Sequence, residues 1–373
     1  MVAARSIKIG FVGDIALSQY FYNNFVNRND DFFSDMAGAW VDCDFVAGNF
    51  EGTLIPNITA FESKHAELQA PEPILNAFLN TPLKVFACAN NHILDSGYKS
   101  LIFTVESLTK RGFLTFGAGA NKNEAHAVQF QNYSDFRIAW IAGCEFFYSH
   151  ARRNKPGSAD YSKKRLIKSI KYALNTSNLI IVMLHADFEF RDHPDPERQK
   201  LCRSLIDAGA NIVICHHPHI WQGIEQYADG FIAYSIGNFL FSIGDYQKNN
   251  NGVMETGLLK IIINFNEHKR PDISWSVIPL RLNNRFYPVP VNDDIAKQWM
   301  HRLNLLSEEL LDKYKLQSAW AVTSKNEIRA IIYGLYYCAC NRGLRQFLKR
   351  LIHVCSEPLT WCATLGAISK GKL

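Results

Sequence analysis

The stretch NIVICHHPHIWQG, residues 211–223, places three of the chain's twelve histidines within four positions. His216, His217 and His219 follow a short apolar run that is typical of a buried strand. Neutral imidazole nitrogen is a common ligand of zinc, iron and other divalent first-row metals. The stretch therefore predicts metal chemistry at the end of a strand.

Four more apolar runs with strand composition end in side chains that can bind a metal or move a proton. They are IKIGFVGD at 7–14, DFVAGNFE at 44–51, KVFACANNH at 84–92 and NLIIVMLHAD at 178–187. Carboxylate, amide and imidazole donors from several strand ends suit a site with two cations, which can orient a water molecule and neutralise a phosphoryl group. The pattern predicts a dinuclear hydrolytic site.

Helical patterns fall between these runs, at 97–111, 161–174 and 195–208. Strands that alternate with helices predict an α/β sheet, and ligands of such sheets sit beyond the carboxyl ends of the strands. We therefore expect six side chains to share one rim of the fold. They are Asp14, Glu51, Asn91, His185, His217 and His219.

The pattern changes from about residue 223 onward. Asp229-Gly230 indicates a hairpin turn, and strands are expected at 256–266 and 272–282. After the extended stretch RFYPVPVNDD the pattern becomes helical, over 294–314, 325–340 and 342–355. We predict one α/β domain at 1–290 and a C-terminal helical extension at 291–373.

Composition excludes several classes of protein. The chain of 373 residues is 47% hydrophobic, and it has no apolar run of about 18 residues that could span a bilayer. Its N-terminal stretch enters a strand pattern directly and does not resemble a secretory signal. The nine cysteines are odd in number and sit mostly in apolar runs, so we expect reduced thiols and a cytoplasmic protein. A net charge of +5 without a basic, aromatic stripe argues against a nucleic-acid partner.

The chain carries, in this order, the motifs GDIALS, GNFEGTL, ANNHILDSG, LHADFEF, DAGANIVICHHPHIWQGIE and AYSIGNFLF. Their order and spacing over roughly residues 6–245 resemble the CapA-type poly-γ-glutamate capsule proteins. These proteins are similar to calcineurin-like metallophosphoesterases. The resemblance implies an α/β fold of four layers, an αββα sandwich, to which the C-terminal helices are appended.

The resemblance also implies roles for individual residues. Asp14 and His219 match ligands of a first metal, and Glu51 matches the acidic residue that bridges two metals. Asn91, His185 and His217 match ligands of the second metal. The implied cofactors are two divalent ions, which could be Mn, Fe, Zn or Mg. His92 matches the histidine that assists the leaving oxygen, with Asp95 as its orienting partner or as a helix cap, while Asn238 and Glu189 are expected near the substrate.

The sequence departs from the phosphoesterase pattern at several positions. The first motif of that pattern has a histidine two residues after the aspartate, where this chain has Ala16. His185 is followed by Ala186 and Asp187, and Asp187 could add a ligand or a hydrogen bond behind the ligands. His216 stands directly before His217, and strand alternation predicts that the two side chains face away from each other.

Each candidate taken singly has a simpler interpretation. Asp14 could be a turn residue at a strand end, and Asn90-Asn91 could form an Asx turn before the next helix. Taken together, ligand-type residues at five strand ends favour a metal site. The basic segment 150–169 could attract an anionic polymer, although a solvated face is the commoner use of such a segment. Residues 342–352 predict a basic amphipathic helix, which either packs on the main domain or lies on an anionic membrane.

We therefore predict a metal-dependent hydrolase that acts on a phosphoester or a related bond in capsule or cell-surface polymer metabolism. Its expected partners are an anionic polymer or phosphoester substrate and proteins of capsule synthesis, with peripheral membrane contact through the C-terminal helices. The rival hypothesis is a non-catalytic protein that binds the polymer or assembles a synthesis complex. Hydrolysis of an amide in a γ-glutamyl polymer is a third option that uses the same site. The capsule role rests on resemblance alone.

Overall fold

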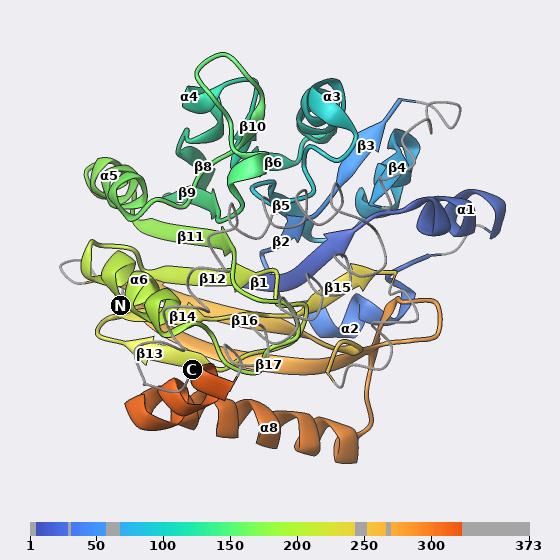
Figure 1. The fold of residues 1–373 in the computed structure, drawn as a ribbon. Coiled ribbons are helices and arrows are strands. Elements are labelled where there is room, and N and C mark those ends of the chain that lie inside the picture. The colour runs from blue at the N-terminus through green and yellow to red at the C-terminus, as the bar shows by residue number, and fades with distance from the viewer. Residues whose placement is uncertain (1–4, 29–30, 57–67, 243–251, 266–269, 323–373) are drawn as a thin grey trace, which may run out of the picture.

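The computed structural model describes residues 5–28, 31–56, 68–242, 252–265 and 270–322 (Figure 1). The helices predicted at 325–340 and 342–355, with the basic amphipathic stretch 342–352, lie outside these residues. Among the described residues, no helix has both the length and the apolar character that crossing a membrane requires.

The first sheet has eight strands, and β1 lies near its middle. The order is β18-β17-β16-β1-β2-β5-β6, and β15 also pairs with β1. Strands β1, β2, β5, β6 and β15 pair in parallel, whereas β16, β17 and β18 join through antiparallel pairs. Their bounds are β1 Arg5–Ala16, β2 Phe45–Phe50, β5 Leu83–Ala87, β6 Leu114–Phe116, β15 Asn238–Phe241, β16 Glu255–Phe265, β17 Asp272–Leu282 and β18 Pro288–Pro290.

The second sheet has six strands in the order β13-β14-β12-β11-β9-β8. Its four central strands are parallel, and an antiparallel strand closes each edge. The bounds are β8 Gln129–Tyr133, β9 Phe136–Cys144, β11 Leu179–His185, β12 Ile212–His216, β13 Ile224–Tyr227 and β14 Gly230–Ala233. Two small sheets pair β3 Thr53–Ile55 with β4 Gln69–Pro71 and β7 Ala118–Gly119 with β10 Gly157–Ser158.

The two large sheets pack face to face through alternate residues of their strands, because side chains on a strand point to opposite faces in turn. Ile9 and Phe11 of β1 thereby share one core with Trp140 and Ile181 of the second sheet. Helices cover the two outer faces, with α1, α2 and α3 on the first sheet and α5 and α6 on the second (Figure 1). The predicted four-layer αββα sandwich is confirmed.

Helix bounds agree closely with the sequence patterns. The helices predicted at 97–111, 161–174 and 195–208 are α3 Gly97–Lys110, α5 Lys163–Leu174 and α6 Pro196–Asp207. Before residue 293, the described residues also form α1 Gln19–Arg28, η1 Ser34–Met36, α2 Ala37–Trp40, η3 Glu72–Phe78, α4 Lys122–Ala125 and η4 Phe147–Ser149. Asp195 caps α6 by accepting from the Glu197 amide, and Pro196 at its first position adds to the start signal.

Helix α8, Asp293–Leu311, lies along the bottom of Figure 1 against β13 and β17. Asn292 caps it by accepting from the Ile295 amide. Trp299 and Leu303 reach the core between the two sheets, so α8 shares that core. The domain boundary near residue 291 stays a prediction.

Candidate metal centre

The side chain of Asp14 is directed between the sheets by an irregularity in β1. Phe11 pairs with Ala47 and Asp14 with Asn49, so β1 has one residue more than β2 in this interval. The extra residue is a bulge, and it turns Asp14 to the same inner face as Phe11. The bulge requires glycine at position 13, because a Cβ there would lie 1.9 Å from the carbonyl oxygen of Gly237, the residue just before β15.

Asn49 connects the first sheet to the second. It faces inward because it continues the alternation of Phe45 and Ala47, which both belong to the core between the sheets. Its Nδ2 donates to Asp14 Oδ1 at 2.8 Å and lies 3.1 Å from His185 Nδ1. Sequence reasoning missed Asn49, although the alternation of β2 could have indicated it.

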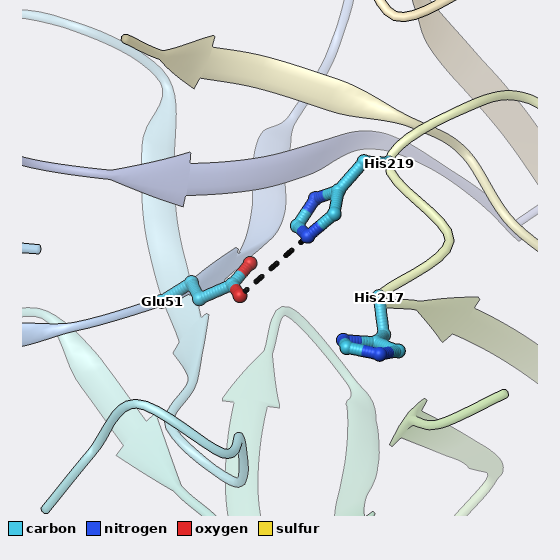
Figure 2. A group of neighbouring side chains, drawn as sticks. All are labelled: Glu51, His217 and His219. Atoms are coloured by element: carbon cyan, nitrogen blue, oxygen red, sulfur yellow. Dashed lines mark ion pairs between the residues drawn. The ribbon is translucent and has the colours of Figure 1, made fainter. Parts of the chain in front are cut away.

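Glu51 follows β2 and has no exposed surface. Neither of its carboxylate oxygens has a hydrogen-bond partner among the described residues. The nearest imidazole nitrogens lie 3.7 Å away on His92, 3.7 Å away on His185 and 4.0 Å away on His219, the pair that Figure 2 marks with a dashed line. Because a buried carboxylate without a partner is costly, its surroundings fit a cation.

The loop after β5 carries Asn90, Asn91 and His92 to the same place. Asn90 donates to the Phe50 carbonyl at 2.7 Å and accepts from the His92 amide at 3.1 Å, which anchors the loop on β2. Asn90 therefore makes the predicted type of Asx turn. Asn90, and not Asn91, anchors the loop, and Asn91 Oδ1 instead lies 2.7 Å from His185 Nε2.

The second sheet contributes the histidines at the ends of β11 and β12. His217 Nδ1 lies 3.1 Å from His185 Nε2. His219 Nδ1 lies 3.2 Å from Asp14 Oδ2 and 3.0 Å from Asn238 Oδ1. The structure thus brings together the six residues that the sequence predicted for one rim.

The backbone that holds these histidines is strained. His217 has φ of 97° and His219 has φ of 59°, and both are non-glycine residues in the left-handed region. Strain of this kind costs on the order of 1–3 kcal/mol per residue and tends to occur at functional sites. Pro218 between them accepts a hydrogen bond from the Phe190 amide at 2.8 Å, which ties the turn to the loop after β11.

His216 lies beside Asp14, and this position corrects the expectation drawn from strand alternation. Its Nδ1 is 3.3 Å from Asp14 Oδ1, and the side chain is 1% exposed. Strand β12 ends at His216, which continues the inward face of Ile212 and Ile214. Alternation does not extend to His217, because the positive φ there breaks the strand.

His92 faces the cluster from its open side. Its Nδ1 lies 2.7 Å from Asp95 Oδ2, and its Nε2 points toward Glu51. The His92 side chain is 30% exposed, so it is the member of this group that solvent reaches. Glu189 is exposed in the turn after β11, and its charge contributes to the raised pKa of Glu51.

Asp187 does not point at the metal candidates. Its Oδ1 accepts from the Phe188 amide at 2.8 Å, and its Oδ2 accepts from the Asp195 amide at 2.9 Å. The carboxylate therefore fixes the backbone of the loop that follows β11. The sequence predicts that Asp187 either binds a metal or forms a supporting hydrogen bond, and these contacts favour the supporting hydrogen bond.

The acidic groups and the histidines of the site have strongly shifted pKa values, some raised and some lowered. Burial, together with the charge of Asp14, raises the pKa of Glu51 to about 8. Burial would also raise the pKa of Asp14, but His216 and His219 outweigh it and hold that pKa well below its usual value. Burial is opposed at His219 by Glu51 and Asp14, which raise its pKa to about 10. Burial lowers the pKa of His185 and His217 well below the usual value, so both stay neutral, the form in which imidazole binds metals.

Within the part of the chain that the structure describes, two groups of donor atoms have the spacing of metal ligands. Asp14, Glu51 and His185 form one, and Glu51, His217 and His219 form the other, with the donor atoms of each group within 4.8 Å of one another. Figure 2 shows the second group, and its member Glu51 belongs to the first group as well. Carboxylate oxygens and imidazole nitrogens suit Mn, Fe and Zn. The donor set and the unpartnered Glu51 oxygens therefore fit divalent cations.

Two CapA proteins, one named for capsule biosynthesis and one for PGA biosynthesis, are among the known proteins similar to this chain. The capsule biosynthesis protein CapA of Bacillus anthracis is 30% identical over 64% of this chain, and the match spans 61% of that protein. The PGA biosynthesis protein CapA of Bacillus subtilis is 27% identical over 78% of this chain and 76% of its own length. The solved calcineurin-like phosphoesterase YfkN from Bacillus subtilis overlaps with a TM-score of 0.40 at 12% identity, over 81% of this chain and 99% of that one. An overlap this loose says nothing of function.

The family model described as bacterial capsule synthesis protein PGA_cap matches residues 8–243. This span contains Asp14, Glu51, Asn91 and the histidines of the second sheet. It also agrees with the roughly 6–245 over which the motifs resemble CapA-type proteins. The chain belongs to the PGA_cap family of bacterial capsule synthesis proteins.

Proposed function

We propose that this protein is a metal-dependent hydrolase of the phosphoester type that works in the biosynthesis of a capsule or another cell-surface polymer. The polymer context comes from the capsule and poly-glutamate proteins to which the chain is similar. The observation that supports hydrolysis is Glu51, a buried carboxylate without a hydrogen-bond partner that belongs to two ligand groups. One carboxylate between two ligand groups suits a pair of cations.

In this proposal six residues hold two divalent ions, which are Mn, Fe, Zn or Mg. They are Asp14, Glu51, Asn91, His185, His217 and His219. When bound, such ions polarise the phosphoryl oxygens and make a water molecule a better nucleophile. Asn49 keeps Asp14 and His185 in register by contacting both.

His92 is the proton donor of the proposed mechanism. Its Nδ1 is held by Asp95, which leaves Nε2 directed at the cluster. A leaving oxygen that enters from the exposed side can take the Nε2 proton, which is the role of a general acid. Asp95 orients the ring and stabilises the protonated form.

The substrate contacts predicted from the sequence involve two different positions. Glu189 is exposed beside the cluster, where its carboxylate can contact an incoming chain. Asn238 is 1% exposed and lies 3.0 Å from His219 Nδ1. Its burial favours orientation of the His219 ring over direct contact with substrate.

His92→Ala tests the catalytic half of the proposal. We expect the variant to lose at least about 100-fold in turnover of bis-p-nitrophenyl phosphate, because general acid catalysis contributes roughly 10²–10⁴. Metal content should stay at the wild-type level, since His92 is not among the proposed ligands. Turnover equal to that of the wild type would remove His92 from the mechanism.

A second candidate function is binding of an anionic polymer without turnover. Ala16 favours it, because this side chain packs in an apolar cluster with Ile220 and Phe241 and offers no ligand. In that case poly-γ-glutamate should stay bound after chelation, and no ester should be hydrolysed at any metal concentration. Hydrolysis of a γ-glutamyl amide would instead release glutamate in a metal-dependent manner. The cytoplasmic location and the membrane contact of the C-terminal helices remain predictions.

A further inference from the structure

His216 is a buried imidazole without a hydrogen-bond partner. Strand β12 carries it inward between the sheets, where it is 1% exposed, and neither ring nitrogen is satisfied by the described residues. Leaving a buried polar group unpaired costs about 1–3 kcal/mol. Such a group in a native fold requires an explanation, and an ion is one of the few that supply a partner.

The contact with Asp14 has the spacing of two ligands on one ion. Ligand atoms about 2.0–2.1 Å from one cation, at angles between octahedral and tetrahedral, lie roughly 2.9–3.4 Å apart. His216 Nδ1 is 3.3 Å from Asp14 Oδ1, and His219 Nδ1 is 3.2 Å from Asp14 Oδ2. Both contacts fall in this range, so Asp14 has an imidazole beside each of its oxygens.

The contact with Asp14 is at best a poor hydrogen bond for one of the two ring nitrogens of His216, and the other nitrogen has no partner among the described residues. Asn49 Nδ2 already donates to the same oxygen at 2.8 Å. The contact of His216 is longer and lacks the alignment of a hydrogen bond, which leaves Nδ1 unsatisfied. On β1 itself, Ala16 packs in an apolar cluster and supplies no donor.

We infer that His216 is a metal ligand, which joins the ligand group of Asp14, Glu51 and His185 that holds one of the two ions. The inference rests on the metal site of the proposed function. A second imidazole on this ion also narrows the class of metal, because imidazole donors favour Zn or Fe over Mg. The side chain that supplies this ligand comes from the second sheet.

Zinc binding by the full chain tests the inference. The wild type, His216→Ala, His216→Gln and His217→Ala are stripped with chelator, reloaded with zinc and measured by elemental mass spectrometry. X-ray absorption of the loaded proteins counts imidazole ligands through their outer-shell scattering. His126→Ala serves as the matched control, because His126 is partly buried beside Asp160 and outside the cluster.

We expect both His216 variants to lose about one ion per chain, or to bind it at least about 100-fold more weakly than the wild type. Substitution of a residue that only contacts the ligands from behind typically weakens metal affinity by about 10–100-fold. Their imidazole signal should fall, while His126→Ala matches the wild type. Full zinc content with an unchanged imidazole signal in His216→Gln overturns the inference, even if His217→Ala loses metal. A folded wild type that takes up no zinc, manganese or iron overturns the proposed metal function as well.

Discussion

Two buried glutamates flank His185 and have opposite surroundings. Glu51 Oε1 is 3.7 Å from His185 Nε2, and Glu51 has no hydrogen-bond partner. The Glu145 amide donates to the His185 carbonyl, and both oxygens of Glu145 are satisfied. They accept from the Tyr161 hydroxyl at 2.7 Å, the Asp187 amide at 2.9 Å and Arg198 Nη2 at 2.5 Å.

The difference is that Glu51, without a partner, is suited to bind a ligand, whereas Glu145, with all its contacts made, belongs to a network that supports the fold. Arg198 is a buried cation provided by the fold, and it neutralises the carboxylates around the loop after β11. Glu51 accepts no hydrogen bond among the described residues, since the nearest imidazole nitrogens stay 3.7 Å or more away, and these unpartnered oxygens suit a cation from outside the chain. Burial raises the pKa of Asp187 to about 7, and the charge of Arg198 opposes this shift without outweighing it.

Arg198→Ala is the most severe test of the supporting network. Removing the cation leaves Glu145 as an uncompensated buried charge, and we expect the free energy of unfolding to fall by about 3–5 kcal/mol. Urea unfolding measures this loss. Lys200→Ala on the same helix breaks only the exposed pair with Glu197 and should change stability by less than about 0.5 kcal/mol. Equal effects of the two variants would erase the contrast between buried and exposed pairs.

Glu51→Gln and Glu145→Gln sharpen the comparison, since each replaces an ionisable carboxyl group with an amide of similar shape. We expect Glu51→Gln to leave the metal-free chain as stable as the wild type or more so, because its carboxylate has no partner to lose. The wild type should gain about 2.7 kcal/mol at a metal concentration 100-fold above its dissociation constant, and Glu51→Gln should gain nothing. Glu145→Gln should be destabilised with or without metal. Unfolding curves with added manganese and with chelator provide the measurement.

Asp160 offers a smaller test at a satisfied carboxylate nearer the surface. Burial raises its pKa, but the hydrogen bond and charge of His126 and the charge of Arg165 outweigh burial and lower it. Because the pKa of Asp160 is lower in the folded than in the unfolded chain, its ionised form stabilises the fold at pH values above the unfolded pKa of 3.8. This stability is lost as the pH falls from 3.8 toward the lower folded pKa. We expect Asp160→Asn to cost about 1 kcal/mol at pH 7 and progressively less below pH 4. A cost that is independent of pH would show that charge is not its source.

Much of the site could be predicted because ligand positions coincide with strand ends. The apolar runs at 44–51 and 178–187 end close to β2 and β11, and Glu51 and His185 at these strand ends enter the cluster. The run FRIAWIAGC of β9 ends next to Glu145 in the same way. Applying the rule to β9 would have predicted a further buried acid beside His185.

Other features could not be predicted from local pattern. The bulge that turns Asp14 inward depends on pairing with β2, and a strand read alone gives no sign of the extra residue. His216 was placed by extending alternation through His217, whose positive φ ends the strand. The two features have the same cause, because the irregular backbone that aims a ligand also breaks the period used to predict its direction.

The pairing of β1 with β16 has a practical consequence for fragments of this chain. Residues Arg5 to Phe11 pair with Phe265 to Leu259, and this partner strand begins after residue 243, where the family match ends. A fragment trimmed to that match would keep every proposed ligand and yet expose the backbone N–H and C=O groups along one edge of β1. Open edges of apolar strands recruit other chains. We expect such a fragment to aggregate, so expression should extend at least through β16.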